Sequence, residues 1–263
     1  MIPNFYLFNK EISVYMLAAL AGVFVILFFC WRLSQKHGLD EIHMLYMLLF
    51  SFIGVLVGGH ILYGITNIPI ILYTLQNLQQ IDSFGAFFER LGLIFGGSVF
   101  YGGLIGAVLV FFVYLKHNKL PIGLYSDIGA AAIPLFHFFG RLGCFLSGCC
   151  YGIIWEHGFV YHHSLVEAAN GVPRFPVQLV EAGCNLLLFL LLSACLKKGW
   201  LKNRLLAVYF SIYPIYRFLL EYLRGDEYRG ILGPFSTSQI ISILLLLVTG
   251  IYWIVSAFKS RNA

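Results

Sequence analysis

The sequence predicts an all-α integral membrane protein with about seven transmembrane helices. Of its 263 residues, 60% are hydrophobic and only 11% are charged, and the mean hydropathy is +0.84. A soluble domain carries roughly a quarter charged residues, so this composition excludes an ordinary globular protein. Apolar segments of about 20 residues, the length that crosses the hydrocarbon core of a bilayer, recur along the whole chain.

Polar clusters separate these apolar segments and define the expected spans. The first segment lacks the small-residue cleavage pattern of a signal peptide, so we expect it to be retained as a helix. We also expect an interfacial helix from Ile70 to Ile81 and a single integral membrane domain over residues 1–263. The expected spans are residues 12–31, 43–65, 91–115, 122–147, 176–196, 203–223 and 235–257.

The distribution of lysine and arginine predicts the orientation of the chain. Ten of these residues lie in the polar clusters at 32–41, 116–119, 197–204 and 259–263, whereas five lie in the segments on the other side. Cytoplasmic loops carry the excess of basic residues, which places the N-terminus outside and the C-terminus in the cytoplasm. Because the basic residues follow topology and form no patch, we expect no nucleic-acid binding.

Arg141, Glu181, Arg217 and Glu221 fall well inside the expected spans, and Asp127 and His60 sit near span ends. An ionised group at the centre of a bilayer costs about 3 kcal/mol or more. Such side chains persist when they pair, line a wet cavity or bind something charged. One interpretation is an ion pair that only joins helices, and the other is a functional site.

The pattern around the two arginines favours the functional interpretation. Arg217, Glu221 and Arg224 stand at i, i+4 and i+7 and share one helix face with Tyr213. That face is too polar for lipid tails, so we expect it to line an internal cavity. Arg141 stands in a Gly-Arg-Leu-Gly segment, whose small residues permit close approach of a helix or ligand. Guanidinium groups match phosphate, and the abundant phosphate in a membrane is a phospholipid head group.

Several segments then carry a resemblance to a known family, in an order and spacing that agree with the predicted topology. They are Gly58–Tyr63 (GGHILY), Tyr101–Gly106 (YGGLIG), Gly140–Gly143 (GRLG), Arg174–Glu181 (RFPVQLVE) and the helix face from Tyr213 to Arg224. With these motifs the sequence resembles the prolipoprotein diacylglyceryl transferase family nearly end to end.

The resemblance implies a multi-pass enzyme of the bacterial plasma (inner) membrane. Such an enzyme moves the diacylglyceryl unit of phosphatidylglycerol onto the cysteine thiol of a lipobox-bearing prolipoprotein, with neither a cofactor nor a metal. By matching position, the expected catalytic residues are Arg141, Arg217, Glu221 and Tyr101, with the arginines facing the leaving phosphate. The expected substrate-binding residues are Tyr15, His60, Gly102, Gly103, Arg174, Gln178, Glu181 and Arg224.

The chain departs from the family pattern inside the expected site. Cys144, Ser147 and Cys149 stand where the family carries two asparagines and a glutamate, and Tyr101 replaces a histidine. An arginine would be usual where His60 stands. A phenol titrates near pH 10 and is a poor replacement for a histidine base. Because these changes fall inside the expected site, the sequence does not identify the acceptor substrate. Alternatives are a family member that uses another acceptor, an inactive lipid-binding scaffold, or a membrane thiol-redox protein.

The cysteines at 144, 149 and 150 have four interpretations. They could form a disulfide near the outer face, a metal site with His157, His162 or His163, a nucleophilic thiol, or plain packing of small residues. The sequence does not choose among these four.

Overall fold

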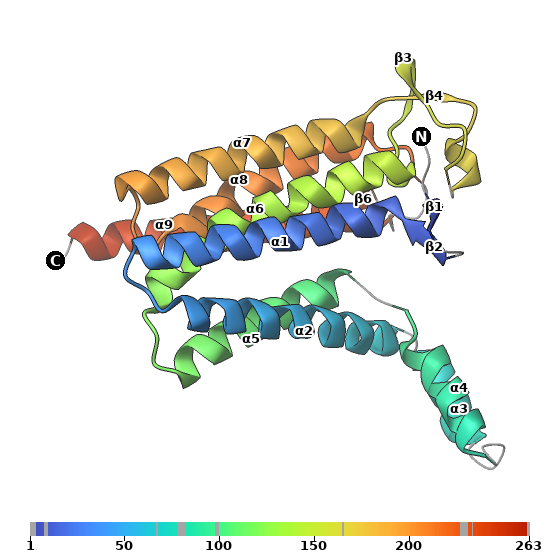
Figure 1. Cartoon of the computed structure of the whole chain (residues 1–263), viewed down its shortest axis with the longest axis horizontal. Coiled ribbons are helices and arrows are strands. Elements are labelled where there is room, and N and C mark those ends of the chain that lie inside the picture. The colour runs from blue at the N-terminus through green and yellow to red at the C-terminus, as the bar shows by residue number, and fades with distance from the viewer. Residues whose placement is uncertain are drawn as a thin grey trace. The chain divides into compact units, whose positions relative to one another are not determined.

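The computed structural model of the chain describes residues 4–7, 10–66, 68–77, 83–97, 100–164, 166–226, 231–232 and 234–261 (Figure 1). Its α-helices are α1 (Val14–Lys36), α2 (Glu41–Thr66), α3 (Ile68–Gln76), α4 (Phe84–Phe95), α5 (Phe100–His117), α6 (Ile122–Ser147), α7 (Val177–Lys198), α8 (Leu205–Leu220) and α9 (Thr237–Arg261). Two short 3-10 helices are η2 (Glu167–Ala169) and η3 (Glu221–Leu223).

Short strands supplement the helices. They are β1 (Asn4–Leu7), β2 (Lys10–Ser13), β3 (Ile154–Val160), β4 (Pro173–Arg174), β5 (Ile231–Leu232) and β6 (Phe235–Ser236). Each pairs antiparallel with its sequence neighbour, as β1–β2, β3–β4 and β5–β6.

The predicted fold class, an all-α multi-pass membrane protein, is confirmed. Among the described residues, five helices are long and apolar enough to cross a bilayer, namely α1, α2, α6, α7 and α9. A shorter apolar helix covers Gly102–His117 within α5. Large apolar side chains such as Phe24, Leu187 and Phe258 are exposed by 60% or more, as expected for a surface that faces lipid. The number of spans and their orientation stay predictions.

The helix boundaries agree with most of the expected spans and correct one of them. The expected span 122–147 coincides with α6. The helix expected from Ile70 to Ile81 corresponds in part to α3, which ends at Gln76, whereas residues 78–81 lie outside the described residues; its interfacial position stays a prediction. The continuous span 91–115 is wrong, because α4 ends at Phe95 and α5 begins at Phe100. Gly96 caps α4 with its N–H on the carbonyl of Gly92, and the neighbouring Gly97 adds a second residue of low helix propensity.

The chain forms two compact units, which we call the terminal unit (Met1–Leu33 with Gly123–Ala263) and the central unit (Ser34–Ile122). In the central unit, α2 packs against α5 through glycines. A Cβ atom built on Gly58 would lie 2.2 Å from the carbonyl oxygen of Gly102, and one on Gly106 would lie 2.1 Å from that of Gly54. The backbones of α2 and α5 therefore touch, as in glycine-mediated packing of transmembrane helices.

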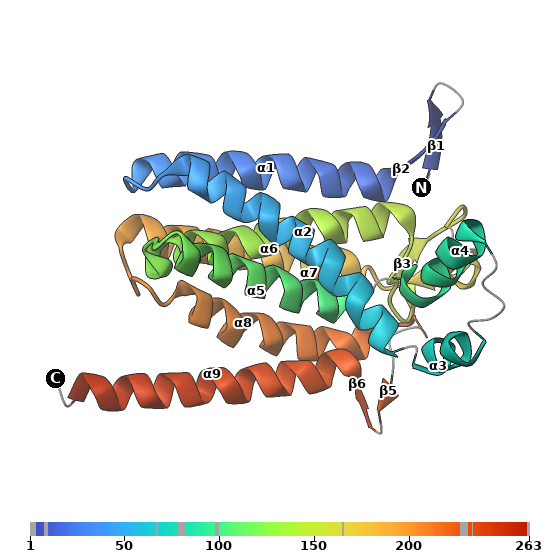
Figure 2. The ribbon, with the colours of Figure 1, turned by 90° about the horizontal axis from the view of Figure 1, so that it is seen from below.

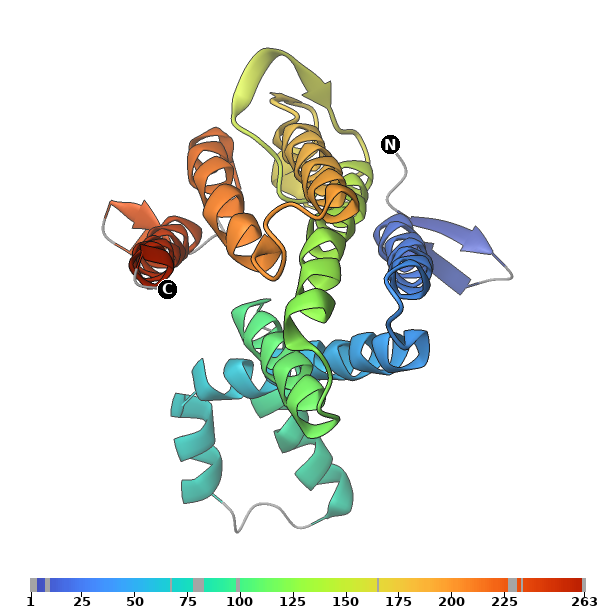
Figure 3. The same cartoon turned by 90° about the vertical axis from the view of Figure 1, so that its left-hand side faces the viewer.

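In the terminal unit, α1, α6, α7, α8 and α9 run alongside one another (Figure 2), and Figure 3 views most of them nearly end-on. Asp127 on α6 holds the start of α8, because its carboxylate accepts hydrogen bonds from the backbone N–H groups of Asn203 (2.6 Å) and Leu205 (2.9 Å). These bonds satisfy donors that a helix N-terminus leaves open. They explain a carboxylate near the end of a predicted span without a catalytic role.

The segment between α6 and α7 is an ordered cap on the terminal unit. Its β3–β4 pair and η2 enclose a small core of Phe145, Tyr151, Tyr161 and Ala169. Gly152 also pairs with Arg224 in an isolated bridge, which ties this segment to the end of η3. The cap therefore lies over the helix ends that carry the predicted site residues.

Candidate functional site

Four ionisable side chains from α6, α7, α8 and the adjoining η3 of the terminal unit meet in one cluster. A guanidinium nitrogen of Arg141 on α6 lies 3.0 Å from Oε1 of Glu181 on α7. Arg217 on α8 lies 4.0 Å from the same Glu181 oxygen and 2.7 Å from Oε2 of Glu221. The two arginines that the sequence singled out therefore share a carboxylate. We call these four residues the arginine cluster.

Burial differs across the arginine cluster and identifies its accessible member. The side chains of Glu181, Arg217 and Glu221 are 3%, 8% and 2% exposed, whereas that of Arg141 is 19% exposed. Two guanidinium and two carboxylate groups balance in charge, as a buried ionic network requires. Arg141 is the cation best placed to meet an anion that enters the cluster.

Neutral polar groups surround the arginine cluster, and Asn185 is one that the sequence analysis did not single out. Asn185, one turn after Glu181 on α7, donates to the Glu181 carbonyl (2.8 Å) and accepts from the Tyr216 hydroxyl (2.9 Å). Arg217 donates to the Ser238 hydroxyl at the start of α9 (3.0 Å). His137 lies on the Arg141 face of α6, with its ring 5.2 Å from that of Tyr213. The i, i+4 spacing of His137 with Arg141 places both on one helix face in the sequence, and the same spacing links Asn185 to Glu181.

Arg224 lies at the other end of the predicted helix face, directly after η3, which follows α8. Its Nε donates to the Asp226 carboxylate (2.8 Å), and a second guanidinium nitrogen pairs with the same group. Burial opposes the charged form of Arg224, but hydrogen bonds to Asp226 together with the negative charges of Cys150 and Asp226 outweigh that effect and hold its pKa above the ordinary value. Arg224 is thus a fixed cation beside the cap.

The three cysteines come together beside this cation. Their sulfur atoms all lie within 4.8 Å of one another, and all three are free thiols. After α6, the chain reverses through Gly148 (φ +77°) and Cys150 (φ +54°), so that the Cys149 N–H bonds to the Cys144 carbonyl (3.1 Å). A positive φ is uncommon for a residue with a side chain. We call Cys144, Cys149 and Cys150 the cysteine cluster.

The surroundings of Cys150 favour its thiolate form. Hydrogen bonds from the Cys144 and Cys149 thiols lower the pKa of Cys150, and the charges of Arg224 and Arg141 act in the same direction. Gln178 on α7 donates to the Cys149 carbonyl (2.8 Å) and to the Tyr161 hydroxyl (3.2 Å). Gln178, expected to bind substrate, thus holds the cysteine-bearing loop. No histidine among the described residues joins these sulfurs in a ligand group.

The other expected residues of the terminal unit take varied positions. Tyr15 on α1 packs against Gly143, where a Cβ atom would lie 3.1 Å from its ring, and it interacts electrostatically with the cysteine cluster and Arg141. Gly140 has no atom within 4 Å of its Cβ position, so only the second glycine of the Gly-Arg-Leu-Gly segment serves close packing. Arg174 stacks over Tyr151 (4.4 Å to the ring centre) and donates to the Ala168 carbonyl. Arg174 therefore braces the cap.

Four expected site residues belong to the central unit. His60 lies with Nδ1 2.7 Å from the Phe95 carbonyl oxygen and 2.8 Å from that of Gly97, which joins α2 to the end of α4. Gly102 and Gly103 face α2 at close range, so helix packing accounts for both. The side chain of Tyr101 lies outside the described part of the chain. Their roles in substrate binding and catalysis stay predictions.

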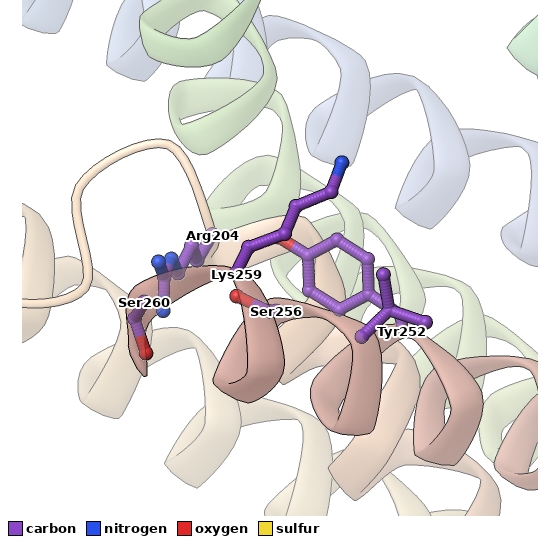
Figure 4. Close-up of a pocket in the computed structure, with 6 residues that line it drawn as sticks. Arg204, Tyr252, Ser256, Lys259 and Ser260 are labelled. Carbon is purple, nitrogen blue, oxygen red and sulfur yellow. The ribbon is translucent and has the colours of Figure 1, made fainter. Parts of the chain in front are cut away.

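A separate pocket of about 480 Å³ lies at the far end of α8 and α9 (Figure 4). Arg204 and Lys259 line it, together with Tyr252, Val255, Ser256 and Ser260. Arg204 precedes Arg217 by 13 residues, which is about 20 Å along a helix axis at about 1.5 Å per residue. This pocket is therefore distinct from the arginine cluster.

Comparisons with known proteins match almost the whole chain. The family model described as "Prolipoprotein diacylglyceryl transferase" matches residues 4–255. A protein of Clostridium tetani named phosphatidylglycerol–prolipoprotein diacylglyceryl transferase is 28% identical, over 98% of this chain and 98% of the relative. A Clostridium perfringens protein of that name, numbered 2, is 30% identical over 95% of this chain and 94% of its own. A Geobacter sulfurreducens protein of the same name is 31% identical over 93% and 90%.

Proposed function

Because the chain belongs to the prolipoprotein diacylglyceryl transferase family, we propose that it transfers the diacylglyceryl group of phosphatidylglycerol to the cysteine thiol of a prolipoprotein. The names of its relatives state this donor and this acceptor. The protein is a multi-pass membrane protein, and we place it in the bacterial plasma membrane.

The observation that carries the proposal is the sharing of Glu181 by Arg141 and Arg217. In the reaction the acceptor sulfur attacks a glyceryl carbon, and a C–S bond forms as the C–O bond to phosphate breaks. The bond pair leaves with glycerol phosphate, which gains negative charge. Fixed cations in a site of low dielectric stabilise such charge, and Arg141, the least buried of the four cluster residues, is the group that meets the phosphate.

The carboxylates of the arginine cluster take positioning roles in this proposal. Glu181 orients both guanidinium groups, and Glu221 holds Arg217 from the same side of α8. A rigid pair of arginines costs little reorganisation when charge develops on the phosphate. Tyr15, which interacts electrostatically with Arg141 and the cysteine cluster, and Arg224, which is held by Asp226, are proposed to contact the head group.

The test is a transfer assay with the purified full chain in detergent micelles. The reagents are phosphatidylglycerol with labelled acyl chains and a synthetic lipobox peptide, and mass spectrometry of the peptide is the readout. We expect a thioether-linked diacylglyceryl peptide, and loss of this product by about 10²-fold or more in Arg141→Gln. Arg204→Gln is the matched control, since it removes an arginine from the other end of α8. A wild-type chain without product, or an Arg141→Gln chain as active as the control, would refute the proposal.

A further inference from the structure

The cysteine cluster has the composition and the spacing of a metal site. Zinc binds thiolate sulfur at about 2.3 Å, which separates the sulfurs of one tetrahedral or trigonal site by about 3.8 to 4.0 Å. The sulfurs of Cys144, Cys149 and Cys150 lie within 4.8 Å of one another, and they are free thiols. A movement of less than about 1 Å would therefore bring all three onto one ion.

The backbone around the cluster holds the three sulfurs in place. The reversal at Gly148 and the positive φ of Cys150 (+54°) return the chain to the end of α6, where Cys144 lies. The Ser147 hydroxyl lies 3.4 Å from the Cys149 sulfur, and Gln178 fixes the Cys149 carbonyl from α7. Groups of this kind orient the ligands of a metal from the surrounding shell.

The electrostatic surroundings also suit an anionic metal–thiolate centre. Three thiolates around a divalent ion carry a net charge of about −1, which is costly near the bilayer without a counter-charge. Arg141 and Arg224 both act electrostatically on the Cys150 sulfur, and they supply that counter-charge.

We propose that Cys144, Cys149 and Cys150 bind a thiophilic d10 metal ion, zinc in the first place, and that its open fourth position takes the thiol of the acceptor cysteine. Catalytic zinc sites have three protein ligands and leave one position for water or substrate. No histidine, aspartate or glutamate among the described residues completes this group. The second half of the inference rests on the proposed function, and the first half does not.

Such an ion would supply a function that the site otherwise lacks. A free thiol has a pKa of about 8.5, and a thiol coordinated to a metal is deprotonated outright. The proton of the acceptor passes to solvent on coordination, and the bound sulfur then attacks the glyceryl carbon while glycerol phosphate leaves with the bond pair. Zinc changes no oxidation state in this step. The metal thereby replaces the base that a phenol at Tyr101 supplies poorly.

The first test measures metal binding by the full chain, purified under reducing conditions in micelles. We expect about one zinc ion per chain by elemental analysis, and a thiolate-to-cobalt charge-transfer absorption after exchange with Co²⁺. Cys144→Ser and Cys150→Ser should lose both signals, while Cys184→Ser, a cysteine on α7 outside the cluster, should keep them. A wild-type chain that binds no metal with its thiols counted as reduced would overturn the inference. So would metal retained equally in all variants, or thiols that are found paired as a disulfide and bind no metal after reduction.

The second test adds a lipobox peptide to the cobalt-loaded chain. The charge-transfer absorption should increase with the cysteine peptide and stay unchanged with the matched serine peptide. An unchanged spectrum with both peptides would overturn the open-position assignment. Transfer activity in a chain without bound metal would refute the metal site and leave the proposed function standing. Bound metal without transfer would support the metal site and refute the proposed function.

Discussion

The arginine cluster allows one substitution series to separate a structural ion pair from a functional site. Arg217→Met removes the guanidinium that lies 2.7 Å from Glu221 and 4.0 Å from Glu181. The cluster then holds one cation and two carboxylates in a site where those carboxylates are at most 3% exposed. Removing one partner of a buried ion pair costs about 3–5 kcal/mol. We therefore expect a large loss of unfolding free energy in Arg217→Met.

A second substitution restores the charge balance without restoring the cation. Arg217→Met with Glu221→Met leaves the Arg141–Glu181 pair intact and replaces the other pair by apolar side chains, which is often neutral or stabilising. We expect the double variant to recover most of the lost stability and still to transfer diacylglyceryl groups about 10²–10³-fold more slowly than the wild type.

The assay combines unfolding in mixed micelles with the peptide transfer reaction on the same preparations. Arg204→Met, which removes the arginine immediately before α8, is the control for loss of an arginine, and it should change neither readout strongly. If the double variant regained wild-type activity together with stability, the arginine cluster would only join helices, and the reasoning would be refuted.

Three further substitutions test the fold and the loop that carries the cysteines. Asp127→Ala should cost about 1–3 kcal/mol of unfolding free energy, because it leaves two backbone N–H groups at the start of α8 without their acceptor (2.6 and 2.9 Å); an unchanged denaturation midpoint would contradict this. Gly106→Leu should destabilise the chain by several kcal/mol, since even its Cβ atom would lie 2.1 Å from a carbonyl oxygen of α2. Gly92→Ala, which meets no atom within 4 Å, is its control, and equal thermal stability of the two would exclude close α2–α5 packing. Gln178→Leu removes the donor 2.8 Å from the Cys149 carbonyl, so the thiols of Cys149 and Cys150 should react faster with a maleimide; an unchanged rate would show that the bond does not hold the loop.

The membrane class and the arginine cluster were predictable because both depend on strong local signals. An arginine within an apolar span is costly, so the positions of Arg141 and Arg217 alone indicated a polar interior. The i, i+4 spacing of Arg217 and Glu221 predicted that both lie on one helix face, and the structure pairs them at 2.7 Å. Glu181 could be singled out as buried, but its sharing by two arginines depends on how α6, α7 and α8 pack.

The parts that sequence reasoning missed depend on weaker signals or on tertiary structure. Asn185 is a neutral polar residue, which costs less in an apolar span than a charge does and so attracts less attention. The break between α4 and α5 lies within a continuous apolar segment, where hydropathy does not register a helix end at Gly96. The convergence of the cysteines requires the backbone reversal at Cys150, which their sequence spacing does not reveal.

The most direct test of the central claim is lipid selectivity measured by native mass spectrometry. The delipidated chain would be offered equal amounts of phosphatidylglycerol and phosphatidylcholine, and the bound species would be counted for the wild type, Arg141→Gln and Arg204→Gln. We predict that the wild type and Arg204→Gln retain the anionic lipid preferentially, because Arg141 is the accessible cation of the cluster, and that Arg141→Gln loses this preference. An Arg141→Gln chain that selects phosphatidylglycerol as strongly as the wild type would contradict the claim.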